Sequence, residues 1–373
     1  MGIERWWRST DRALVLVTLA LTLLGLLFIG SASHINQAGL HVSDYLAKQA
    51  AFLVADIAIF VYLLRFDYRK LYRYAPALYG ANLIVLIAVM VVGTSALGAQ
   101  RWITIGPISI QPSEFAKIIY IVCLARFLCR PSLDLKKWSG LFYTALFLLP
   151  PFALVLLQPD LGTSLVFGAI TLGGLYIAGV RMDYIRKVCL AGLAVLPLAW
   201  FFLLKEYQKN RILVLFDPER DPFNTGYHVI QSKIAIGSGG LIGKGLFAGT
   251  QSQLNFLPEN HTDFIFAVVG EETGMVGALL LLLLYFVLLY RGVWIASTAA
   301  DRFGRYIATG IVAMWLFQIF INVGMTIGIM PVTGIPLPFL SYGVSSLTLN
   351  LCSVALLLNI YLRRKTVLFD ASA

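Results

Sequence analysis

The chain has 373 residues, of which 59% are hydrophobic and only 13% are charged. A soluble domain is usually about 45–50% apolar and about 25% charged, so this composition excludes an ordinary soluble enzyme or a disordered chain and indicates a membrane protein with many spans. The formal net charge of +10 at pH 7 therefore bears on orientation in the membrane, and no nucleic-acid partner is expected.

Ten apolar runs are long enough to cross a hydrocarbon core about 30 Å thick, which takes about 20 helical residues. They predict an all-α integral membrane protein that forms one domain over residues 1–373. Between the seventh and eighth runs lies a long polar segment, 205–263, which we expect to be a structured outer loop that carries function. The expected spans lie near 13–33, 48–65, 75–95, 113–129, 140–158, 162–180, 188–204, 264–290, 306–329 and 341–362.

Lysines and arginines concentrate in alternate loops of this arrangement. The positive-inside rule therefore predicts that both termini face the cytoplasm, and the even number of spans agrees with that orientation. Basic residues on the predicted cytoplasmic side include Arg5, Arg8, Arg12, Arg126, Arg130, Arg181, Arg186, Arg291, Arg363, Arg364 and Lys365.

The long loop contains a glycine-rich run, Gly237–Gly245, that invites comparison with a nucleotide P-loop. A P-loop is excluded, because the run lacks the glycine five residues before its Gly-Lys pair and the Ser or Thr after it. Two interpretations stay open: a tight or flexible re-entrant turn, or backbone amides that approach a lipid pyrophosphate. The histidines and cysteines lack metal-ligand spacing, so no metal site is predicted.

Glu114 and Lys117 stand three residues apart at the outer start of the fourth span and therefore share a helix face. Ionisable side chains within a span indicate function by default, because their burial in hydrocarbon is costly. The two either form a structural ion pair, or the glutamate holds the lysine toward an anionic ligand. Asp160, where the fifth and sixth spans meet, either caps the sixth helix or joins Lys117 in an outward-facing polar cluster.

Three more carboxylates lie within predicted spans. Asp56 is alone in the second span, and the sequence indicates no partner for it. Glu271 and Glu272 lie about two helical turns inside the eighth span, beside glycines, where contact between helices explains them at least as well as chemistry.

The segment Leu257–Phe266 places Glu259, His261 and Asp263 just before the eighth span, at the outer boundary between water and lipid. A carboxylate there can meet a lipid headgroup and act as a general base toward a sugar hydroxyl. The competing interpretation is that Asp263 or Thr262 only caps the eighth helix, which would lower the aspartate's pKa and weaken it as a base. Charge that develops on a departing pyrophosphate needs cations, for which the candidates are Lys117, Arg101, Arg211 and Lys233.

Four blocks of sequence occur in a fixed order between the predicted spans. Together they resemble the SEDS family (shape, elongation, division and sporulation proteins), and the likeness covers nearly the whole chain. The stretch Asn322–Met330 is more similar to the RodA-like elongation branch than to the division branch. The four blocks are Arg101-Trp102 with Gln111–Lys117, Gln158–Thr163, Pro258–Phe264 and Pro331–Gly343.

The resemblance implies a peptidoglycan glycosyltransferase with ten membrane helices in the bacterial cytoplasmic membrane, which polymerises lipid II on the outer leaflet. It also implies a class B penicillin-binding protein as partner, together with other membrane proteins of the elongation complex. The family's essential aspartate falls on Asp263, and its cavity residues and outer Arg-Trp pair fall on Glu114, Lys117, Asp160, Arg101 and Trp102. One departure is Val344, where the family commonly has a second glycine.

On this basis we predict an inverting glycosyl transfer with Asp263 as the base, and with Glu259 and His261 near the substrate. No cofactor is required, although a divalent cation is a candidate to assist the pyrophosphate. One rival is a transporter that flips lipid-linked precursors, since membrane carboxylates and Gly/Pro-broken helices suit that class too. Another is a scaffold that only recruits the penicillin-binding protein.

Overall fold

The computed structural model describes residues 10–33, 43–96, 99–106, 108–202, 204–222, 224–254 and 256–364. Arg5, Arg8 and Lys365 of the predicted cytoplasmic set lie outside the described residues. The helices are α2 (Arg12–Ala32), α3 (Ser43–Arg65), α4 (Lys70–Val92), α5 (Pro112–Leu128), α6 (Trp138–Leu157), α7 (Leu161–Ile177), α8 (Met182–Phe202), α9 (Glu206–Phe216), α10 (Thr225–Gly239), α11 (Thr250–Gln253), α12 (Ile265–Thr298), α13 (Arg302–Thr326) and α14 (Val344–Leu362), with the strands β1 (Thr94–Ala96), β2 (Ala99–Ile105) and β3 (Ile108–Ile110) and a short 3-10 helix, Pro218–Arg220.

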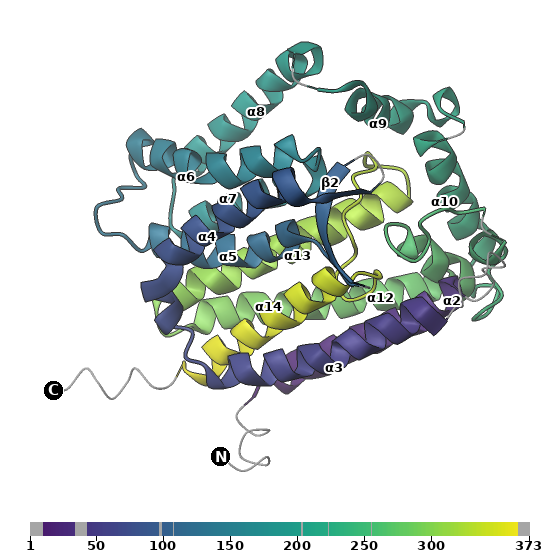
Figure 1. The fold of residues 1–373 in the computed structure, drawn as a ribbon, viewed down its shortest axis with the longest axis horizontal. Helices are drawn as coiled ribbons and strands as arrows, with labels where there is room; N and C mark the ends of the chain where they lie inside the picture. The colour runs from purple at the N-terminus through teal and green to yellow at the C-terminus, as the bar shows by residue number, and fades with distance from the viewer. Residues whose placement is uncertain are drawn as a thin grey trace.

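Long helices form a bundle around α14, most of whose residues are buried against α3, α5, α12 and α13 (Figure 1). Each expected span coincides with a helix, and within the described part of the chain seven helices are both long and apolar enough to cross a membrane. Leu161–Ile177 is apolar but shorter. The helical membrane fold is therefore confirmed, whereas the count of ten spans stays a prediction.

The two predicted sets of loops separate to opposite ends of the bundle. At one end Arg291 pairs with Asp11 at the start of α2, and Arg363 lies 3.7 Å from Asp67 in the loop between α3 and α4. At the other end lie α9, α10 and β2 (Figure 1). This separation is what the alternation of basic loops requires, although it does not say which end faces the cytoplasm.

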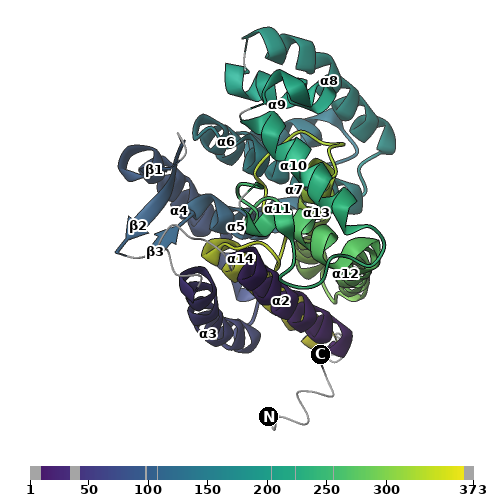
Figure 2. The same cartoon turned by 90° about the vertical axis from the view of Figure 1, so that its right-hand side faces the viewer.

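A small antiparallel sheet, β1-β2-β3, stands beside α4 at the edge of the bundle (Figure 2). The all-α expectation missed it, because its strands have only three to seven residues and follow directly on a membrane helix. The sequence does carry a weak signal, since β-branched residues alternate with polar ones along Ile103–Ile110. The sheet positions Arg101, which lies on β2.

Gly274 interrupts α12 with a φ of 66°, a left-handed conformation that favours glycine. The glycine-rich run packs into this break: Lys244 N donates to Glu271 O (3.1 Å) and Gly245 N donates to Glu272 O (2.9 Å). The run is therefore a tight re-entrant turn. The other interpretation, in which its amides bind a pyrophosphate, is wrong for these two amides because they already satisfy carbonyls of the broken helix.

Candidate functional site

Asp263 lies immediately before α12, where the long outer segment re-enters the bundle. The N-cap of α12 is Phe264, and it makes no side-chain capping bond. The interpretation that Asp263 or Thr262 only caps this helix is therefore wrong. Among the described residues, the Asp263 carboxylate accepts no hydrogen bond, so it stays available to a substrate.

The backbone around Asp263 is fixed by the loop that precedes α14. Asn322 of α13 donates from Nδ2 to Asp263 O (2.9 Å) and to Ile335 O (2.8 Å), so one amide ties both segments together. Gly334, at a φ of 75°, lies against the carboxylate, where a Cβ would stand 3.3 Å from Asp263 Oδ2. This position therefore requires a residue without a side chain.

Burial and neighbouring charges set the protonation of Asp263. Removal from water, together with the nearby carboxylates of Glu259 and Asp160, raises its pKa to about 6, while Arg211 and Arg101 oppose that rise. At neutral pH the group is therefore mostly ionised but more basic than an ordinary aspartate. A general base works best in this range.

Arg101 reaches from β2 to the start of α7. Its Nε donates to Gln158 O (3.0 Å), its Nη2 donates to Pro159 O, and its Nη1 lies 3.8 Å from Asp160 Oδ1. Asp160 also accepts from Thr163 N (3.1 Å). The prediction that Asp160 caps the helix is confirmed, and the polar cluster it joins contains Arg101.

Arg211 of α9 has fewer protein partners. Its Nη1 donates to Thr333 O at 3.3 Å, and the ring of Tyr207 lies 5.9 Å from its guanidinium. Burial and the neighbouring Arg101 lower the pKa of Arg211, while Asp263 opposes that shift. Of the two arginines beside Asp263, Arg211 has the more donors left for an anionic ligand.

Glu114 and Lys117 form a buried ion pair, with Lys117 Nζ 2.7 Å from Glu114 Oε1. The predicted pairing on one face of α5 is thus present, while a role toward a ligand stays a prediction. Among the described residues, no hydrogen bond or ion pair joins Lys117 to Asp160, so the expectation that the two belong to one cluster stays a prediction. Gln111 stands nearer to Asp160 instead, with Nε2 3.4 Å from Oδ2.

Four other predicted site residues lie at the margin of this cluster or outside it. Glu259 is exposed and accepts from Thr262 Oγ1 (2.9 Å), but its charge still acts on Asp263. The ring of His261 lies against that of Tyr45, with centroids 4.7 Å apart and planes tilted by 42°, and its burial lowers its pKa, so it is neutral at pH 7.

Trp102 and Lys233 point elsewhere. Trp102 pairs with Thr94 in the sheet, and because neighbouring residues of a strand face opposite sides, its side chain faces away from that of Arg101. Lys233 is exposed on α10, and its side chain lies over Gly328, where no Cβ blocks it. In the described part of the chain neither contacts the charged groups around Asp263.

Two residues that position Asp263 were not predicted to belong to the site. Asn322 and Gly334 both fall within stretches that carry the family resemblance. An asparagine inside an apolar helix was the available signal, because a buried amide needs hydrogen-bond partners. Which partners it finds depends on packing between α13 and distant loops, and no local pattern encodes that packing.

The described residues include no group of three His, Cys, Asp or Glu side chains that could hold a metal ion. The carboxylates present therefore do not fit a cation site made by protein groups alone.

Comparison with known proteins adds a family match over residues 11–366, to the FtsW/RodA/SpoVE model described as "Cell cycle protein". Among curated relatives, peptidoglycan glycosyltransferase MrdB of Escherichia coli K12 is 43% identical, covering 95% of this chain and 94% of its own. Stage V sporulation protein E of Bacillus subtilis is 37% identical, covering 94% and 97%.

Solved structures agree with these relatives. Thermus thermophilus rod shape determining protein RodA superposes with a TM-score of 0.72 at 31% identity, covering 96% of this chain and 99% of that one. A chain from a structure titled "Structural coordination of polymerization and crosslinking by a peptidoglycan synthase complex" reaches a TM-score of 0.82 at 32% identity, covering 95% and 98%.

Proposed function

This chain belongs to the FtsW/RodA/SpoVE family and is a peptidoglycan glycosyltransferase, and we propose that Asp263 is the general base with which it polymerises lipid II. It is a multi-pass membrane protein. The observation that carries the proposal is a single partly buried carboxylate that accepts no hydrogen bond among the described residues, has a pKa of about 6 and stands beside two arginines.

The proposed step is one displacement. Asp263 removes the proton from the 4-hydroxyl of an acceptor N-acetylglucosamine, and that oxygen forms a bond with the anomeric carbon of the donor muramic-acid unit. The bond from that carbon to the pyrophosphate breaks, and undecaprenyl pyrophosphate leaves with the electron pair. A single displacement inverts the α-linked donor into a β-1,4-linked strand.

Negative charge grows on the pyrophosphate oxygen as it leaves, and cations nearby stabilise it. We assign that role first to Arg211, which has free donors, and secondly to Arg101, whose guanidinium is already held by the α7 entry. Lys117 is placed deeper, paired with Glu114, and we propose that it binds an anionic part of the substrate.

The proposed partner is a class B penicillin-binding protein that crosslinks the product, with further membrane proteins of the elongation complex. The peptidoglycan synthase complex among the similar structures supports this pairing. We propose that the protein resides in the bacterial cytoplasmic membrane with both termini inside. The site then opens on the outer face, where lipid II is polymerised.

A transporter would use similar membrane charges, but the relative MrdB is called a peptidoglycan glycosyltransferase, which favours transfer. The decisive assay is lipid II polymerisation by the full-length chain purified with its penicillin-binding protein. Asp263→Ala and Asp263→Asn should lower the rate about 10²- to 10⁴-fold, because they remove the base.

The matched control is Asp217→Asn, which changes an exposed aspartate of the same outer segment whose side chain makes no capping hydrogen bond. It should leave the rate unchanged. Rapid polymerisation by folded Asp263→Asn would refute the assignment of the base. A wild-type chain that moves lipid II between leaflets without extending glycan would favour the transporter.

A further inference from the structure

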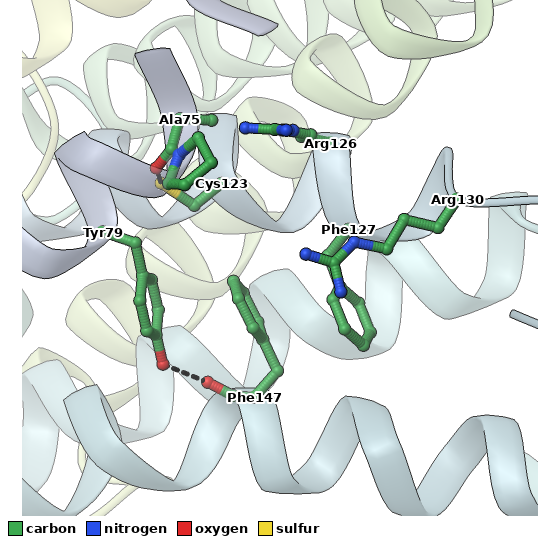
Figure 3. A pocket seen from close by; sticks show the side chains of 8 residues that line it. Ala75, Tyr79, Cys123, Arg126, Phe127, Arg130 and Phe147 are labelled. Atoms are coloured by element: carbon green, nitrogen blue, oxygen red, sulfur yellow. Dashed lines mark hydrogen bonds between the residues drawn. The ribbon is translucent and has the colours of Figure 1, made fainter. Parts of the chain in front are cut away.

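A pocket lies between α4, α5 and α6, at the end of α5 that is remote from Asp263 (Figure 3). Glu114 is in the first turn of α5 and Arg126 is in its last. A helix rises about 1.5 Å per residue, so the pocket and the charged entry of α5 are roughly 18 Å apart along the axis. The pocket is therefore separate from the site described above.

Two arginines supply the polar end of the pocket. Arg126 is in the last turn of α5 and Arg130 lies just beyond its end, and one nitrogen of Arg126, Nη1, is buried without a hydrogen-bond partner. Neither arginine forms a salt bridge in the described part of the chain, and no carboxylate lines the pocket there. An unsatisfied buried donor on one of two arginines, in a pocket without a carboxylate, favours an anion at this end of the pocket.

The rest of the pocket is aromatic and apolar. Phe147 stacks on Phe127 (4.6 Å between centroids) and on Tyr79 (4.5 Å), and Tyr79 Oη donates to Phe147 O (2.7 Å) (Figure 3). An adjoining hollow continues from Arg130 along α6 to Pro150. The side chains at this apolar end are therefore already packed and hydrogen-bonded, and they form a preformed wall.

The hollow has a cationic end and an apolar end, which match the headgroup and the acyl chains of an anionic phospholipid. Its arginine end lies at the end of the bundle that carries the basic loops, while Tyr143 and Leu146 are exposed on the outer face of α6, where acyl chains pack. From Tyr143 to Pro150 this wall extends roughly 10 Å along the helix. A small soluble anion would use the arginines but would not need that wall.

We propose that this pocket binds an anionic phospholipid, with the phosphate between Arg126 and Arg130 and one acyl chain along α6. Basic pockets between membrane helices on the cytoplasmic side are suited to anionic headgroups. The proposal concerns lipid binding only, and it holds or fails independently of Asp263.

The test is native mass spectrometry of the full-length chain titrated with dioleoylphosphatidylglycerol or dioleoylphosphatidylcholine. We expect the wild type to prefer the anionic lipid about tenfold, and Arg126→Gln with Arg130→Gln to reduce that preference below about twofold. The matched control is Arg181→Gln with Arg186→Gln, two exposed arginines at the same end that pair with Asp183. It should keep the preference.

A second variant, Leu146→Trp, fills the apolar part of the hollow with a larger side chain and leaves both arginines in place. It should weaken binding of the anionic lipid several-fold, and it tests the proposal even if the arginine double variant does not fold. The proposal is overturned if the arginine variant keeps its tenfold preference, or if Leu146→Trp binds like wild type. Displacement of the lipid by millimolar inorganic phosphate would mean a site for free anions, and would also overturn it.

Discussion

Asp263 and Glu271 are both acidic and lie close together in the chain, yet their surroundings differ completely. Glu271 is fully buried in α12 and saturated: Lys244 Nζ lies 2.8 Å from its Oε1, and Gln251 N donates to the same oxygen at 2.9 Å. Asp263 accepts no hydrogen bond among the described residues, and charged groups of both signs act on it instead.

The difference separates a structural carboxylate from a reactive one. Each partner of Glu271 holds the long outer segment against the break in α12. The charge of Glu271 is therefore fully paired within the fold. A group that must take up a proton cannot be held in this way, because bonds to its charged form lower its basicity. The hydrogen bonds that each carboxylate accepts therefore distinguish the structural group from the reactive one.

Arg211→Gln gives the largest effect among the neighbours of Asp263. Loss of one stabilising donor should slow polymerisation about a hundredfold. Because Arg211 opposes the rise in the pKa of Asp263, its removal should also move the acid limb of the pH–rate profile to higher pH. Arg220→Gln, an exposed arginine of the same outer segment, should do neither.

Glu271→Gln should damage stability and spare chemistry. It leaves Lys244 and two backbone amides without their anion, at a cost of about 2 kcal/mol, measurable as a lower melting temperature of the purified protein. The rate per folded molecule should stay within about twofold of wild type. Glu206→Gln breaks an exposed pair with Lys209 and should cost almost nothing. If Glu271→Gln abolished turnover in folded protein, the comparison would fail.

Glu259→Gln should have the smallest effect. The charge of Glu259 raises the pKa of Asp263, so its removal should lower that pKa and move the acid limb to lower pH. At pH 7 Asp263 is already mostly ionised, and the rate should change by less than about twofold. A shift in the same direction as that of Arg211→Gln would contradict the proposed electrostatics.

The membrane helices and several site residues could be predicted from the sequence, because membrane helices need long apolar runs and because motifs keep their order. Asp263, Arg101 and Asp160 come together as their blocks suggested. The ion pair of Glu114 with Lys117 followed from helix periodicity alone.

The missed features depend on contacts between distant segments. The break at Gly274 is stable only because the glycine-rich run supplies amides to it, and Asn322 finds its partners only once α13 meets two loops. Asp56, unassigned from sequence, accepts from Thr348 Oγ1 of α14 at 2.7 Å. The position of the Lys233 side chain over Gly328 could not be predicted, since a charged residue in a long loop gives no local sign of the direction in which it points.

The pH dependence of kcat/KM for lipid II polymerisation tests the role of Asp263 most directly. The rate should be flat above pH 7 and fall tenfold per unit below about pH 6, where the carboxylate becomes protonated. The residual activity of Asp263→Asn should lack this limb. An unchanged limb in Asp263→Asn would show that another group is the base.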